Sequence, residues 1–211
     1  MNFREFVKLF QNTPIIESGL FSLYGNPEDL RRQVLRWTKK KYLHVLKKGI
    51  YVLSDEYKKT KTSPLFAANQ LLSPSYISME YALGKYGLIP EKVEIITSIT
   101  TKKTQSYENI FGRFEYKSIS KKLFFGMIQE TTDQQKYFIA LPEKAVLDFF
   151  YFNYEAKPDF AYFESLRLQN MESLNKKTLA EYSTKYNKRV QDLINSFLKY
   201  ILYSKNKFKT L

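Results

Sequence analysis

Apolar positions near the start of the chain recur at intervals of three and four residues, which is the period of an amphipathic helix. The residues that share this apolar face are Phe3, Phe6, Val7 and Phe10. Pro14 ends the run, because proline has no N–H group to continue helical hydrogen bonding. A second, short helix is expected over about residues 17–24, with Gly25 at its end. The start of the chain therefore predicts two helices.

A third helix has the clearest start signal in the sequence. Asn26 is suited to cap this helix, and Pro27 is suited to its first position. Glu28 and Asp29 follow, and acidic side chains favour the positive end of a helix dipole. Beyond them, one side of the predicted helix is apolar and another is cationic. The apolar side carries Leu30, Val34 and Trp37, and the cationic side carries Arg32, Arg36, Lys39 and Lys40.

Two β-prone runs come next, at residues 42–46 and 50–53, with Gly49 in the turn between them. Glycine permits the positive φ that a tight hairpin turn requires. Three helices followed by a β-hairpin predict a winged helix-turn-helix domain over residues 1–58. The polar segment 55–63 predicts the boundary to a second domain.

The second domain is expected to span residues 63–211 and to contain both kinds of periodicity. Helical spacing predicts helices over about 64–72, 79–86, 142–152 and 189–203. Alternating or apolar runs predict strands over 93–99, 114–119, 123–128 and 136–140. The last part, about 155–211, is expected to be helical, with two or three helices. The fold class predicted for the chain is therefore α+β, with a mostly antiparallel sheet in the second domain.

The chain of 211 residues has a formal net charge of +13, and that charge is unevenly placed. A positive charge favours a polyanionic partner, because neutralising phosphates releases counterions. No acidic residue lies between Asp29 and Asp55. The cations in this interval are Arg31, Arg32, Arg36, Lys39, Lys40, Lys41, Lys47 and Lys48. A solvated helix face would explain a basic stripe alone, but here a basic hairpin turn accompanies it. Because the recognition helix and the wing of a helix-turn-helix both face DNA, the pattern predicts duplex binding.

Different roles are expected along this segment. The candidates for reading guanine are the bidentate donors nearer the start of the helix, Arg31, Arg32 and Arg36. The candidates for phosphate contacts are Lys39, Lys40, Lys47 and Lys48. A small winged helix contacts few base pairs, so we expect two half-sites about 10 base pairs, or a multiple, apart. The protein is expected to be a monomer or weak dimer in solution and to pair on DNA.

Residues suited to catalysis or metal binding are few. His44 is the only histidine and lies on a predicted strand among apolar neighbours, which favours a structural or surface role over a general base. With one histidine and no cysteine, a Cys/His metal site is excluded. Glu143 and Asp148 would diverge by about 140° on a helix, so capping and ordinary solvation explain them better than paired catalysis does. The sequence therefore predicts a protein that is not an enzyme and has no metal or cofactor.

The chain is also expected to be cytoplasmic and to have no membrane partner. It contains no run of about 20 apolar residues, which a spanning helix requires. Its first five residues lack the apolar core of a secretion signal. The absence of cysteine is compatible with a reducing compartment.

Several motifs over residues 1–155 resemble those of one family. They are KGIYVL at 48–53, SYISMEYAL at 75–83, YGLIPE at 86–91, IITSIT at 95–100, GRFEY at 112–116, FG at 125–126 and ALPEKAVLD at 140–148. In order and spacing this set resembles the AbiEi-type antitoxins of bacterial toxin–antitoxin systems. One departure is Lys41, where relatives often have glycine after the recognition helix.

The resemblance implies an antitoxin whose N-terminal winged helix represses its own operon by binding inverted repeats. The larger domain would counter the toxin, which in this family is a nucleotidyltransferase-like protein encoded alongside. Many such pairs resemble the class in which toxin and antitoxin form no stable complex, so no tight heterodimer is expected.

Two other functions remain open. The chain could be a ligand-responsive transcriptional regulator without a toxin, since its aromatic content is compatible with a pocket. Its basic C-terminal helices could also bind RNA, although a solvated face with a basic tail explains them better. The cations of that region are Lys176, Lys177, Lys185, Lys188, Arg189, Lys199, Lys205, Lys207 and Lys209.

Overall fold

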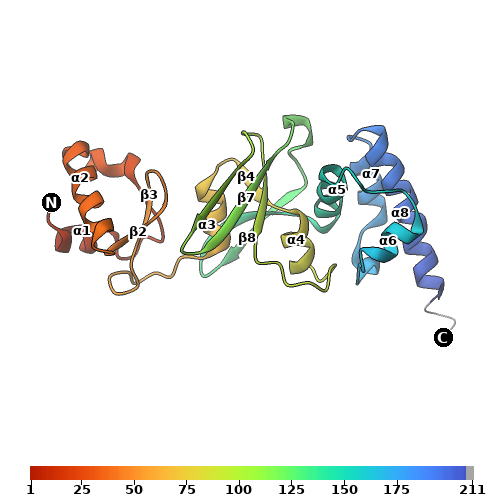
Figure 1. The fold of residues 1–211 in the computed structure, drawn as a ribbon, viewed down its shortest axis with the longest axis horizontal. Helices are drawn as coiled ribbons and strands as arrows, with labels where there is room; N and C mark the ends of the chain where they lie inside the picture. Colours follow the sequence, from red (N-terminus) through yellow and green to blue (C-terminus); the bar gives the residue numbers. More distant parts are fainter. Residues whose placement is uncertain (208–211) are drawn as a thin grey trace.

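The computed structural model describes residues 1–207 of the chain. The molecule is elongated, and its parts follow one another along the long axis in sequence order (Figure 1). Helices and a hairpin form one end, a large sheet with α3 and α4 beside it forms the middle, and the C-terminal helices form the other end. Within residues 1–207 the strands form a three-stranded and a six-stranded sheet, so the fold is α+β as predicted.

The N-terminal unit contains the predicted helices and hairpin, and a short strand in addition. Its elements are α1 (Phe3–Phe10), β1 (Ile16–Glu17), the 3-10 helix η1 (Ser18–Tyr24), α2 (Pro27–Lys39), β2 (Leu43–Lys47) and β3 (Ile50–Leu53). The strands are antiparallel in the order β1-β3-β2. Phe6, Phe21, Val34 and Trp37 pack together in its core, and Phe6 lies 4.9 Å from Trp37 between ring centroids.

The local signals at α2 and at the hairpin turn act as predicted. Asn26 caps α2, because its Oδ1 accepts hydrogen bonds from the backbone N–H groups of Glu28 (2.9 Å) and Asp29 (3.3 Å). Gly49 has a φ of +82° between β2 and β3. Lys41 follows α2 with a φ of +60°, a conformation that glycine adopts at lower cost.

The six-stranded sheet has the order β6-β7-β5-β4-β9-β8. Its strands are β4 (Ser75–Ile77), β5 (Ile96–Thr100), β6 (Gln105–Asn109), β7 (Gly112–Ser118), β8 (Met127–Thr132) and β9 (Gln135–Ala140). Neighbours are antiparallel except β5 with β7 and β4 with β9. The strand predicted over 123–128 was placed wrongly, because residues 121–123 form the 3-10 helix η2 (Lys121–Leu123) and the strand starts at Met127. The short central strand β4 and the edge strand β6 had no strand prediction.

The helices of the second domain are α3 (Pro64–Leu71), α4 (Met79–Lys85), α5 (Pro142–Phe152), α6 (Phe160–Ser165), the 3-10 helix η3 (Met171–Ser173), α7 (Lys176–Ser183) and α8 (Lys188–Lys207). The hydroxyl of Tyr116 on β7 donates to the backbone oxygen of Ala68 on α3 (2.6 Å), which joins α3 to the sheet. Beyond the sheet, α5 leads into the C-terminal helices (Figure 1). Phe150, Phe163 and Phe197 from α5, α6 and α8 pack together there.

Strand β3 of the hairpin β2–β3 is buried on both faces. Tyr51 and Leu53 pack in the core of the N-terminal unit, whereas Ile50 and Val52 belong to the core of the second domain. This alternation is the period of a strand that lies between two layers. The amide of Asn109 on β6 also donates to the backbone oxygen of Leu46 (3.2 Å). The two units therefore share a continuous apolar contact through the hairpin.

The segment between the two sheets, where the sequence predicts the domain boundary, is bonded to the parts of the chain on either side of it. On one side, the hydroxyl of Thr62 donates to the backbone oxygen of Pro14 (2.6 Å). On the other, the amide of Gln135 donates to the backbone oxygen of Lys61 (2.7 Å) and accepts from the N–H of Ser63 (3.1 Å). These bonds add to the contact made by the hairpin.

Candidate nucleic-acid interface

Helix α2 divides cleanly into a buried and a charged side. Leu30, Val34 and Trp37 are buried against the N-terminal core. Six of the seven candidate contact residues are exposed, namely Arg31, Arg32, Arg36, Lys39, Lys40 and Lys48. The first five of these lie on or directly after α2, and Lys48 lies in the hairpin turn. The sequence pattern therefore placed these six side chains in solvent correctly.

The first turn of α2 partly neutralises its own arginines. Arg31 pairs with Glu28, and Arg32 lies 3.8 Å from a carboxylate oxygen of Asp29. Half or more of each of these side chains is exposed, and ion pairs of this kind contribute little to stability, so an incoming anion can displace them. Arg36 makes no ion pair with any residue that the structure describes. The unneutralised charge of α2 therefore lies in its second half.

An apolar side chain lies among these cations, which the sequence reasoning overlooked. Leu35 is 59% exposed although it belongs to a helix whose other leucine, Leu30, is buried. At 100° per residue, Leu35 falls between Arg31 and Lys39 on the charged side. An exposed apolar group in this position is suited to contact a thymine methyl group in the major groove.

Lys47 differs from the other six candidates. Its ammonium group donates to the backbone oxygen of Leu71 on α3 and lies 5.5 Å above the ring of Tyr107 on β6. Burial lowers the pKa of Lys47 below its ordinary value, and the nearby charge of Lys102 lowers it further. Lys47 therefore faces the second domain, and we leave it out of the candidate interface.

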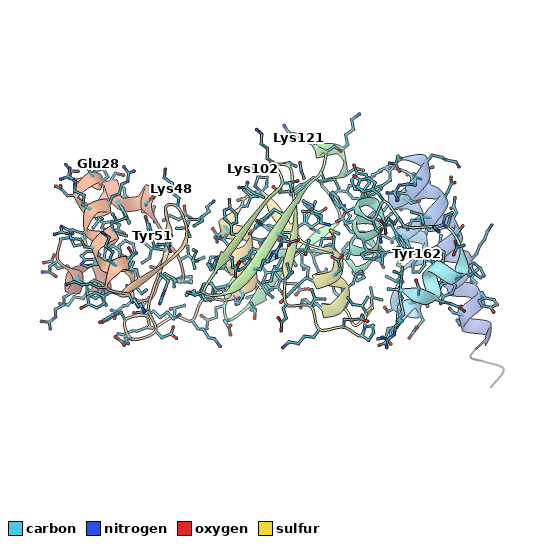
Figure 2. The ribbon with its side chains drawn as sticks, in the orientation of Figure 1. Glu28, Lys48, Tyr51, Lys102, Lys121 and Tyr162 are labelled. Atoms are coloured by element: carbon cyan, nitrogen blue, oxygen red, sulfur yellow. The ribbon has the colours of Figure 1, made fainter. Side chains whose placement is uncertain are left out.

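Other lysines extend the basic side of the molecule beyond the N-terminal unit. Lys102 lies in the turn between β5 and β6, and Lys121 lies in η2. Both are exposed, and Figure 2 places them with Lys48 along the same upper side of the molecule. The sequence analysis missed this, because only the sheet topology brings the β5–β6 turn near the hairpin.

A buried ion pair lies in α5, far from the candidate interface. Lys144 and Asp148 are both fully buried and pair with each other. Asp148 also accepts from the hydroxyls of Tyr76 (3.0 Å), Ser78 (2.7 Å) and Tyr186 (3.1 Å). The interpretation of Glu143 and Asp148 as solvated carboxylates is therefore wrong: Asp148 is inside this network. Glu143 is also buried, and it accepts from the backbone N–H of Asn175 (2.7 Å). The overlooked signal was a Lys/Asp pair four residues apart in an otherwise apolar helix.

Several C-terminal cations bind within the protein. Arg189 donates to the backbone oxygens of Phe150, Tyr151 and Asn153, where α5 ends. Lys188 pairs with Asp192 (2.9 Å), and Lys185 lies 4.0 Å above the ring of Phe125. Lys209 lies outside the described residues. These contacts give part of the basic C-terminal region a structural explanation.

Comparison with known proteins assigns these features to no family. No family model matches the chain, and no curated protein shows significant similarity to it. Among residues 1–207, no three His, Cys, Asp or Glu side chains gather as a metal site would require. In the same part of the chain, no helix has the length and apolar character needed to span a bilayer.

Proposed function

We propose that this protein is a cytoplasmic DNA-binding repressor, in which residues 1–58 form a winged helix-turn-helix and α2 enters the major groove. The order of helix, strand, two helices and hairpin is the one expected of such a domain. The observation that carries the proposal is the one-sided charge of α2: its apolar side is buried, and its basic side is free in solvent.

Within the proposal, each contact residue has a separate role. Arg36 is the principal base reader, because it is a bidentate donor without an ion-pair partner among the described residues. Lys39, Lys40 and Lys48 bind phosphates. Arg31 exchanges its pairing with Glu28 for DNA when the duplex arrives, and Arg32 does the same with Asp29.

We further propose that the protein is an antitoxin that represses its own operon through inverted repeats, as the AbiEi-type resemblance implies. Two of its motifs meet in the structure: Tyr76 and Ser78 of the 75–83 motif bond to Asp148 of the 140–148 motif. This contact gives both motifs a role in folding the second domain. The toxin expected is a nucleotidyltransferase-like protein that forms no stable complex with this chain.

Footprinting on the DNA upstream of the protein's own gene tests the repressor. We expect two protected half-sites about 10 base pairs, or a multiple, apart. Lys39→Ala/Lys48→Ala should reduce the slope of log affinity against log salt by about 1.8, since each phosphate contact contributes about 0.9. Lys157→Ala/Lys177→Ala, which changes two exposed lysines near the other end of the molecule, should leave the slope unchanged. Equal effects of the two double variants would contradict an interface on α2.

Co-expression with the neighbouring gene tests the antitoxin. If that gene encodes a nucleotidyltransferase-like toxin, the full chain should restore growth of cells that produce it. Arg36→Ala should lose repression and keep this rescue, because the proposed duties belong to different domains. Failure of the full chain to restore growth would remove the antitoxin function and leave the repressor standing.

A ligand-responsive regulator is the second candidate function. The observation that favours it is a cavity of about 390 Å³ beside α3, the helix whose last residue accepts the ammonium group of Lys47.

A further inference from the structure

The cavity beside α3 has apolar walls and polar groups at its rim. Its lining residues are Asn69, Gln70, Ser73, Pro74, Ser75, Phe124, Met127, Lys136 and Phe138. They come from α3, the start of β4 and the segment before it, the residue directly after η2, and the strand pair β8–β9. A volume of about 390 Å³ lies within the range of small-molecule sites.

The apolar part of the cavity is only partly covered by the protein. Phe138 is 46% exposed on β9, where Gln129 of the edge strand β8 lies directly opposite. Phe124 and Met127 are half-buried beside it. A single exposed phenylalanine needs no explanation, but three apolar side chains around one hollow form a surface that a ligand would remove from water.

The polar groups of the cavity favour an anion. Lys136 is exposed and has no ion-pair partner among the described residues, and none of the nine lining residues is acidic. The cavity therefore offers a cation next to apolar walls.

We propose that this cavity binds a small apolar monocarboxylate, with its hydrocarbon or aromatic body against Phe124, Met127 and Phe138. The carboxylate pairs with Lys136. The site lies in the second domain and does not depend on DNA binding.

The position of the cavity couples ligand binding to the position of the hairpin. The effect of this coupling on DNA binding rests on the proposed repressor function. Asn69 and Gln70 line the cavity, and the next residue, Leu71, accepts the ammonium group of Lys47. Asn69 also accepts from the backbone N–H of Phe138, so α3 is tied to the wall of the cavity. A ligand that shifts α3 would therefore shift the hairpin against α2, and so change affinity for DNA.

Calorimetric titration of the full chain with phenylacetate and octanoate, each against its neutral amide, tests the site without DNA. Both carboxylates should bind, and each amide should bind about two- to fivefold more weakly, because an ion pair with an exposed lysine contributes about 0.5–1 kcal/mol. Lys136→Met should remove this preference. Lys157→Met, at an exposed lysine outside the cavity, should keep it.

Three results would overturn the site: no heat from either carboxylate, equal binding of acid and amide, or unchanged preference in Lys136→Met. The coupling between the cavity and the hairpin has a separate readout, which is the affinity for operator DNA measured with and without the carboxylate. Unchanged operator affinity in the presence of bound ligand would refute the coupling alone. A protein that binds the carboxylate and no DNA would refute the repressor and leave the site intact.

Discussion

The buried pair Lys144–Asp148 offers a quantitative test of the second domain. Asp148→Asn would leave the Lys144 ammonium buried without a negative charge, although Tyr186 still accepts from it (2.6 Å). Lys144→Met would leave the Asp148 carboxylate buried with three hydroxyl donors. Breaking a buried pair on one side costs about 3–5 kcal/mol. We expect Asp148→Asn near the upper limit and Lys144→Met near the lower, because Asp148 keeps more hydrogen bonds.

The double variant Lys144→Met/Asp148→Asn removes both charges and keeps an oxygen that can accept from the hydroxyls. Its loss of stability should therefore be well below the sum of the single losses, with a coupling free energy of about 2–3 kcal/mol. Urea unfolding followed by far-UV circular dichroism measures all the stabilities required.

The chain contains a matched control on α8. Lys188 and Asp192 have the same four-residue spacing, but 80% and 46% of their side chains are exposed. The same cycle, with Lys188→Met and Asp192→Asn, should give a coupling of about 0.3–0.5 kcal/mol. Additive losses at Lys144 and Asp148, or couplings of equal size at the two pairs, would refute the argument that burial sets the strength of the α5 pair.

Further outcomes are expected at four places. Gly49→Ala should lower the free energy of unfolding by at least about 1–2 kcal/mol in urea titrations, because the φ of +82° strains alanine and its Cβ would lie 2.9 Å from the Ser18 hydroxyl oxygen. Lys41→Gly should raise it by about 0.5–1 kcal/mol, since the strain relieved at a φ of +60° exceeds the entropy that glycine adds to the unfolded chain. Burial raises the pKa of several tyrosines above the ordinary 10.0, that of Tyr86 to about 12. The unfolded chain then binds fewer phenolic protons than the folded one, so thermal melts should show stability falling as pH rises from 10.0 to about 12. Lys47→Met should leave the salt dependence of DNA binding unchanged, because its ammonium group faces α3.

Local signals predicted the N-terminal unit well, because its helices and turn are specified by neighbouring residues. Asn26 and Pro27 start α2, and Gly49 closes the hairpin. Such signals act over three or four residues and need no knowledge of the rest of the fold. The exposure of the basic residues on α2 followed from the same periodicity.

The features that the sequence did not reveal depend on distant parts of the chain. β4 has three residues and is too short to show the alternation of apolar and polar residues that marks a strand, yet it lies between β5 and β9 in the middle of the sheet. The Lys47 side chain points toward α3 because it donates to the backbone oxygen of Leu71, which is 24 residues away in the sequence. The four consecutive apolar residues of β3 were the signal available for the interface with the second domain. A wing with one face in water would alternate apolar and polar residues, whereas all four residues of β3 are apolar.

The two-sided burial of β3 also limits how the proposed DNA-binding surface can move. Separating the N-terminal unit from the second domain would expose Ile50 and Val52, which are 7% and 1% accessible, and would break the bond between Asn109 and Leu46. Exposing two such side chains costs about 1.5–3 kcal/mol each, so the separated state would be a minor one. In the docked state, Lys48 keeps a fixed position relative to Lys102 on the second domain (Figure 2). If α2 binds a duplex as proposed, the hairpin turn lies beside it, and a signal that alters the contact of the hairpin with α3 or with β6 would change the position of that turn.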